Sequence, residues 1–151
     1  MRKQLLKGLT MLLAIMTLAL VTAVASANGQ TQQAKANIPF GFVVGDTNLP
    51  AGDYTIGAIT TSGEVLRIRG TESQDSVMQL TMEANGKANH AKLVFHRYGE
   101  RYFLAQVWTT SNDGRELMTS KQEQAIQKDL SRIGSNKPAS RAYETIELVL
   151  Q

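Results

Sequence analysis

The sequence predicts a mainly β fold, a small antiparallel barrel or sandwich of about seven strands with one helix near the C-terminus. Three observations lead to this class. Short runs that alternate apolar and polar residues recur along the chain, bounded by Gly, Asn, Asp or Ser. Residues 91–109 contain the only Trp and have the pattern of a tight hairpin. Helical spacing with a start and a stop signal occurs at residues 121–133.

Residues 1–27 have the features of a cleaved signal peptide. A basic start precedes a nearly continuous apolar run at residues 9–25, and Ala25-Ser26-Ala27 provides the small residues of a cleavage site. An uncleaved membrane anchor is the rival interpretation, although the run is at the short limit for a spanning helix. We expect an exported protein, periplasmic or extracellular, with no membrane span after cleavage.

The rest of the chain divides into a leader and one domain. Residues 28–36 are polar without periodicity and are predicted to form a disordered leader. Residues 37–151 are predicted to form a single β-rich domain, which is long enough to bury its own core. The chain has no cysteine, so disulfides, thiolate metal sites and cysteine nucleophiles are excluded.

The positive net charge belongs to the export signal. The chain carries 16 basic and 13 acidic residues, a net charge of +3. Three of the basic residues and none of the acidic ones lie in residues 1–27, so 13 minus 13 leaves the mature chain at zero. We therefore expect no nucleic-acid partner. Arg67 and Arg69 alternate on a predicted strand and are interpreted as a solvated face.

Three strands are predicted in the first part of the domain, each with apolar residues at every second position. They are residues 38–44 (Ile38, Phe40, Phe42, Val44), 53–60 (Tyr54, Ile56, Ala58) and 64–69 (Leu66, Ile68). Pro39 places the start of the first at a sheet edge, because proline lacks a backbone N–H.

Residues 76–83 are the next predicted strand, with Met78, Leu80 and Met82 in phase. Asn85-Gly86 then indicates a two-residue type I′ turn. Such a turn pairs Leu80 with Ala91 and Met78 with Leu93. The sequence therefore predicts a three-stranded meander that continues into the hairpin.

The hairpin is predicted to turn at Gly99-Glu100, because a type II′ turn needs positive φ at its first central position. This turn pairs Tyr98 with Arg101, Phe95 with Leu104 and Ala91 with Trp108. The core face is then Ala91, Leu93, Phe95, Leu104 and Trp108. The opposite face also carries apolar residues, so we expect another element, a helix or a second sheet, to cover part of it.

A capping box, Ser120-x-x-Glu123, predicts a helix at residues 121–133, with Gly134 just past its end. Its narrow apolar stripe is Ala125, Ile126, Leu130 and Ile133, which suits packing on a sheet. A last strand follows, in which Ile146, Leu148 and Leu150 alternate with other residues.

Two groups of motifs carry a resemblance. Ile38-Pro39-Phe40-x-Phe42-x-Val44-Gly45 precedes Leu49-Pro50-Ala51-Gly52-x-Tyr54, and Leu93-Val94-Phe95-x-Arg97-Tyr98-Gly99 precedes Tyr102-Phe103-Leu104. With these motifs most of the mature chain resembles a family of small exported bacterial β-rich proteins of unknown function, chiefly from soil acidobacteria. The resemblance implies export and one β-rich domain. It implies no activity, and it transfers no functional residue.

No catalytic, cofactor-binding or metal-binding residue is assigned. His90 and His96 point to the same side of a strand, but about 20 Å apart, so they cannot chelate one ion together. No serine stands in a G-x-S-x-G elbow. The candidate sites are instead a recognition surface formed by His96, Tyr98, Arg101 and Phe103, and a ligand cavity lined by Met78, Phe95 and Trp108. Cross-strand pairing within the hairpin is the structural alternative for these aromatic residues.

Three functions stay open. The first is a non-catalytic interaction or structural module of the cell envelope or extracellular space, whose partner is an envelope protein that binds a strand edge or the hairpin. The second is a small barrel that binds an apolar small molecule. The third is a hydrolase whose active-site residues are dispersed in the sequence, because a catalytic triad assembles only in space.

Overall fold

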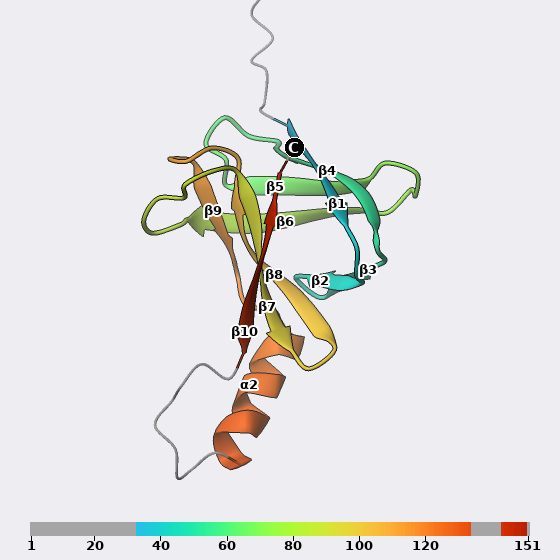
Figure 1. Ribbon diagram of the computed structural model, residues 1–151, viewed down its shortest axis with the longest axis vertical. Helices are drawn as coiled ribbons and strands as arrows, with labels where there is room; N and C mark the ends of the chain where they lie inside the picture. The colour runs from blue at the N-terminus through green and yellow to red at the C-terminus, as the bar shows by residue number, and fades with distance from the viewer. Residues whose placement is uncertain (1–32, 134–142, 151) are drawn as a thin grey trace, which may run out of the picture. The chain divides into compact units, whose positions relative to one another are not determined.

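The computed structural model describes residues 33–133 and 143–150 of the chain (Figure 1). These residues form a sheet of ten strands and one helix near the C-terminus. The elements are β1 (Gln33–Ile38), β2 (Phe42–Val44), β3 (Thr47–Leu49), β4 (Gly52–Ala58), β5 (Val65–Gly70), β6 (Ser76–Glu83), β7 (Lys92–Tyr98), β8 (Arg101–Trp108), β9 (Gly114–Leu117), α2 (Lys121–Ile133) and β10 (Glu144–Val149). The mainly β class with one late helix is confirmed, with ten strands where the sequence predicted fewer.

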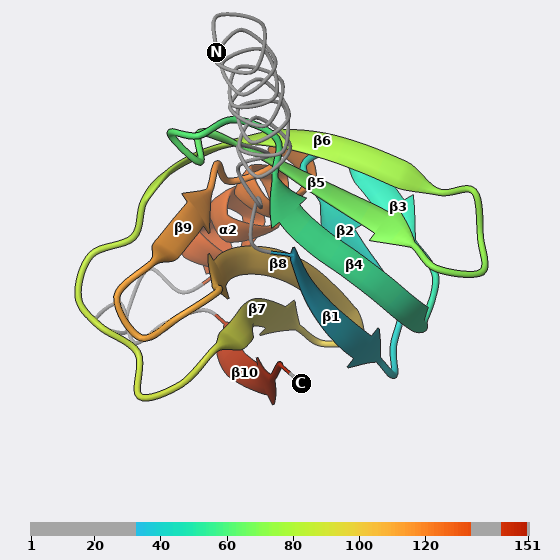
Figure 2. The same cartoon turned by 90° about the horizontal axis from the view of Figure 1, so that it is seen from above.

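Most neighbouring strands of the sheet run antiparallel. The order is β1-β4-β5-β6-β9-β8, and β7 and β10 continue it beyond β8. The β2–β3 hairpin joins through β2, which runs parallel to β8 where Val43 lies opposite Phe103. Seen from above, the sheet curls, with β5 and β6 on one side and β7 and β10 on the opposite side (Figure 2). The curled sheet is not closed, since no ladder joins β1 to β10 among the described strands.

The main core lies inside the curl, where alternate residues of the strands meet. Phe42 packs edge to face against Tyr54 and Phe95, with ring centroids 5.1 and 5.7 Å apart. Other buried members are Ile38, Val44, Leu49, Ile56, Leu66, Ile68, Leu93, Leu104, Val107 and Leu117. Each fully buried side chain of this size contributes about 1.5–3 kcal/mol to folding. The inward faces predicted for β4 and β5 are therefore confirmed.

The first strand differs from its prediction in two ways. β1 begins at Gln33, so residues 33–36 belong to the sheet and not to an unstructured leader. The strand predicted at residues 38–44 is split, because β1 ends at Ile38, just before Pro39, and β2 begins at Phe42. The predicted signal peptide lies outside the described residues.

The hairpin turn forms as predicted, but its register changes farther from the turn. Gly99 has a φ of 61°, and Tyr98 and Phe95 lie opposite Arg101 and Leu104. A bulge follows, because Phe95 pairs with Leu104 whereas Val94 pairs with Gln106. An extra residue in one strand switches the faces beyond it. Trp108 therefore lies opposite Lys92 and not Ala91, outside the main core.

The predicted meander is wrong. Strand β6 pairs with β5 and β9, while β7 pairs with β8 and β10, so Leu80 and Met78 lie opposite neither Ala91 nor Leu93. Asn85 lacks the positive φ that a type I′ turn needs, and only Gly86 has it. The segment after β6 instead packs over the outer face, where Ala84, Ala88, Val94 and Trp108 form a second buried cluster.

Strand β6 has the predicted bounds but the opposite orientation. Val77 packs against the core, and the Thr81 hydroxyl donates a hydrogen bond to the Gly63 carbonyl at 3.0 Å. Met78, Leu80 and Met82 therefore point away from the core.

Helix α2 begins where the sequence predicts it. The backbone N–H of Glu123 donates to the Ser120 hydroxyl oxygen at 3.0 Å, which satisfies one of the unpaired donors of the first turn. Of the predicted apolar stripe, Ile126 packs against a third cluster, formed by Val43, Tyr98 and Phe103. The helix thus covers the part of the second hairpin face near the turn, as the apolar residues on that face indicated.

Candidate functional site

A buried carboxylate connects helix α2 to the hairpin. Glu123, 4% exposed, accepts two hydrogen bonds on Oε1: from Nδ1 of His96 at 2.8 Å and from the hydroxyl of Tyr98 at 3.1 Å. A carboxylate can only accept, so Nδ1 of His96 is the donor in this contact. Gln127 Nε2 donates to the Tyr98 oxygen at 2.8 Å. Burial, with a smaller effect of the nearby Glu123 charge, raises the pKa of Tyr98 to about 12.

The predicted recognition residues do meet in this cluster, but mostly beneath the helix. Tyr98 is 7% exposed and Phe103 is 1% exposed. The His96 ring stacks on Tyr143, with centroids 3.9 Å apart. Arg101 remains exposed; its guanidinium binds Gln122 of the helix and lies 5.2 Å above the Phe103 ring. The four residues therefore fasten the helix to the hairpin and do not form an open aromatic surface.

The predicted cavity residues lie in three separate environments. Phe95 is fully buried in the main core, Trp108 belongs to the outer cluster beneath the loop after β6, and Met78 is 61% exposed on β6. The bulge in β8 and the outward orientation of β6 account for this separation. The three side chains do not line a common space.

The sequence did not predict the exposed apolar row on the outer face of β6. Met78, Leu80 and Met82 are 61, 60 and 57% exposed and follow one another at every second position. Their direct neighbours across the sheet are Val65 and Arg67 on β5 and Glu116 on β9. The alternation itself was visible in the sequence, but it does not say which face meets the core.

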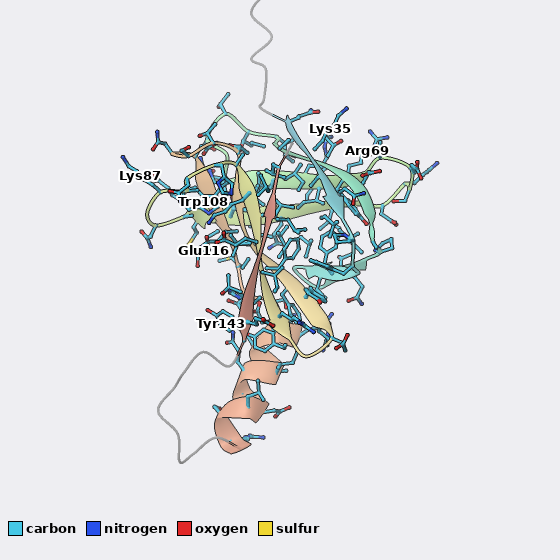
Figure 3. All side chains as sticks on the ribbon, in the orientation of Figure 1. Lys35, Arg69, Lys87, Trp108, Glu116 and Tyr143 are labelled. Atoms are coloured by element: carbon cyan, nitrogen blue, oxygen red, sulfur yellow. The ribbon has the colours of Figure 1, made fainter. Side chains whose placement is uncertain are left out.

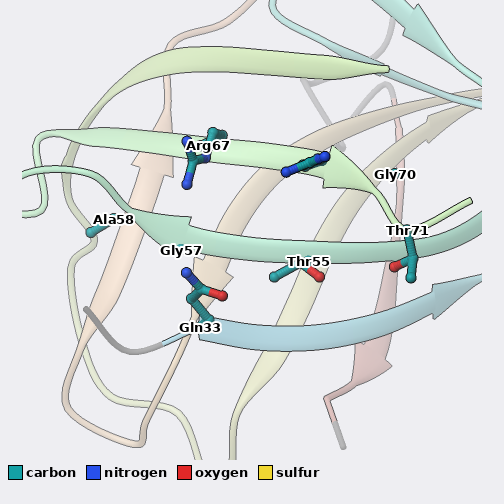
Figure 4. A pocket seen from close by; sticks show the side chains of 8 residues that line it. Gln33, Thr55, Gly57, Ala58, Arg67, Gly70 and Thr71 are labelled. Carbon is teal, nitrogen blue, oxygen red and sulfur yellow. The ribbon is translucent and has the colours of Figure 1, made fainter. Parts of the chain in front are cut away.

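A polar groove lies on the same outer surface, across β1, β4 and β5 (Figure 4). Its volume is about 270 Å³. The lining residues are Gln33, Thr55, Gly57, Ala58, Arg67, Arg69, Gly70 and Thr71. Lys35 and Arg69 extend from the same side of the sheet (Figure 3), because both lie opposite Thr55 on the central strand. Arg67 and Arg69 are thus on a surface, as predicted, but on a hollowed one.

Within the part of the chain that the structure describes, His, Asp and Glu side chains form no group of three or more that could hold a metal ion. No helix in residues 33–133 and 143–150 has the length and apolar character to cross a membrane. Comparison of the chain with protein-family models, with curated proteins and with solved structures found no match.

Proposed function

We propose that this chain is an exported, non-catalytic interaction module of the cell envelope or extracellular space. It binds a partner protein through the outer face of β6. The observation that carries the proposal is the apolar row formed by Met78, Leu80 and Met82, each more than half exposed. Contiguous exposed apolar side chains mark interaction sites, and Met and Arg are enriched in the cores of interfaces.

The row runs along β6 and has a charged neighbour at each end. Met78 and Met82 are four residues apart on one strand, which is about 13 Å. Arg67 stands beside Met78 and Glu116 beside Met82, so a charged group flanks each end. Apolar residues at the centre with charges around them are the usual arrangement of a protein-binding patch.

Export and the finer fold class belong to the same proposal. The basic start, apolar run and small-residue cleavage site of residues 1–27 support export, and so does the resemblance to exported bacterial proteins. We also classify the fold as a small, incompletely closed barrel, because the strands follow one another round the curl from β1 to β10.

A hydrolase is the second candidate, because His96 and Glu123 have the geometry in which a carboxylate orients a general base. Three features weigh against it. Glu123 is also bound by Tyr98, the His96 ring is stacked against Tyr143, and His96 does not line the polar groove across β1, β4 and β5. Ester hydrolysis by the purified chain that disappears in His96→Ala would favour this candidate.

The proposed interaction is tested by native mass spectrometry of the exported chain, isolated gently from its own host. The wild type is expected to carry a protein partner, and the variant Met78→Ser/Leu80→Ser/Met82→Ser is expected to lack it. The matched control is Met118→Ser/Val149→Ser, which removes exposed apolar side chains elsewhere (54 and 65% exposed). A partner that survives the triple substitution, or a wild type without one, would contradict the proposal.

A further inference from the structure

Three basic side chains gather on the outer face beside the apolar row. Arg67 lies opposite Gly57, and Arg69 and Lys35 lie opposite Thr55 from the two sides of β4. Residues directly opposite one another share a face of the sheet, so all three cations are on the outer one. Arg67 and Arg69 are about 7 Å apart along their strand, and Lys35 lies about 10 Å from Arg69 across β4.

The two arginines of this group have no counter-charge among the described residues. No carboxylate oxygen there lies within 4.0 Å of either guanidinium, whereas Arg97, Arg115 and Arg132 each pair with an acidic side chain. Asp53, two positions along β4 from Thr55, accepts a hydrogen bond from Asn37 at 2.7 Å. Two like charges held side by side are more stable when an anion lies between them.

The shape of the groove leaves room for such an anion. Gly57 lies between Gln33 and Arg67 and presents no side chain, so the space between its neighbours stays open (Figure 4). Thr55, Thr71 and Gln33 add hydrogen-bonding groups to the lining, and none of the lining residues is acidic. The volume, about 270 Å³, is smaller than that of a typical drug-sized pocket.

We propose that this groove is a binding site for an oxyanion group, a carboxylate or a phosphate, carried by a small polar molecule or by one unit of a polymer. The planar guanidinium groups of Arg67 and Arg69 match the oxygen atoms of such groups with paired hydrogen bonds. The groove spans β1, β4 and β5 and shares only Arg67 with the surroundings of the apolar row, because Arg67 lies opposite Met78.

The test is a titration of the ¹⁵N-labelled exported chain at constant ionic strength, in one arm with inorganic phosphate and in the other with glucuronate. The expected result is a saturable shift of the amide signals of Thr55, Gly57 and residues 67–70 in at least one arm. The anion that binds more tightly shows whether the groove prefers a phosphate or a carboxylate.

Four variants distinguish binding in the groove from non-specific attraction of the anion to positive charge. Arg67→Gln/Arg69→Gln is expected to weaken binding about tenfold or more, because charged hydrogen bonds are lost. The control Arg132→Gln, on the exposed face of α2, is expected to bind like the wild type. Gly57→Val keeps both arginines but fills the groove, and it is expected to weaken binding too. Asp53→Asn is expected to tighten it, because a nearby negative charge is removed.

Signals that shift equally at all basic residues, or binding that survives both Arg67→Gln/Arg69→Gln and Gly57→Val, would overturn the proposal. An absence of saturable shifts in both arms would overturn it as well. Thermal unfolding of each variant checks that the fold is retained.

Discussion

The Nδ1 atom of His96 lies 2.8 Å from the Oε1 atom of Glu123, and this contact joins the middle of β7 to the first turn of helix α2. The same carboxylate accepts the Tyr98 hydroxyl at 3.1 Å. One buried residue thus holds two groups of the hairpin.

Glu123→Ala is expected to lower the free energy of unfolding by about 3 kcal/mol, because it leaves the buried Tyr98 hydroxyl and the His96 N–H without their acceptor. Urea unfolding followed by circular dichroism measures the loss. Glu100→Ala is the control, since that side chain is 94% exposed at the hairpin turn. Equal stability of the two variants would show that the carboxylate does not hold the helix.

The raised pKa of Tyr98 predicts a loss of stability at alkaline pH. The folded chain keeps the Tyr98 proton up to about pH 12, whereas the unfolded chain releases it near the ordinary value of 10.0. Between these values the unfolded state binds fewer protons, so stability falls as pH rises. Tyr98→Phe is expected to reduce this slope in urea unfolding between pH 9 and pH 12. Part of the slope should remain, since burial also raises the pKa of Tyr54. A slope that is unchanged in Tyr98→Phe would contradict the claim that burial of the Tyr98 hydroxyl causes this loss of stability.

The orientation of β6 predicts opposite outcomes for two leucines on neighbouring strands. Leu66→Ala is expected to cost about 2–5 kcal/mol, because Leu66 is 1% exposed in the main core. Leu80→Ala is expected to change stability by no more than about 0.5 kcal/mol, because Leu80 is 60% exposed. Chemical denaturation of both variants measures the two changes in the free energy of unfolding. A large cost at Leu80 would mean that the apolar row of β6 faces the core.

Substitution of Gly114 tests how closely the backbone packs against Trp108 in the outer cluster. A Cβ atom there would lie 2.5 Å from the Trp108 ring, so the rigid indole would have to move. Gly114→Ala is expected to cost about 1–3 kcal/mol and to shift the fluorescence of this single Trp. Gly41→Ala is the control, since its Cβ would meet the Leu49 carbonyl oxygen at an ordinary 3.6 Å. Unaltered Trp emission in Gly114→Ala would contradict this packing.

Local signals in the sequence predicted the elements that depend on neighbouring residues. Gly99 specified its turn because the position needs positive φ, and Ser120 specified the helix start because its hydroxyl accepts a backbone N–H. The pairing of β6 with β9 had no such signal, because it joins residues far apart in the chain. The bulge in β8 also had none, and it moved Trp108 to the outer face.

The candidate sites also depend partly on long-range contacts that local sequence signals do not specify. The sequence placed His96, Tyr98 and Phe103 on one face of the hairpin, and they do lie together. The position of Glu123 beside them, and their burial beneath the helix, depend on tertiary packing. The sequence predicts Arg67 and Arg69 on one strand face. The groove beside them depends on tertiary pairing, because β4 places Gly57 opposite Arg67 and β1 places Gln33 opposite Gly57.

The central claim, that the outer face of β6 binds a partner protein, is tested most directly by photo-crosslinking in the native host. A photoreactive phenylalanine derivative replaces Leu80 in one strain and Met118, which is also exposed, in another. We predict one discrete crosslinked protein from position 80 and none of that mass from position 118. No adduct at position 80, or the same adducts at both positions, would contradict the claim.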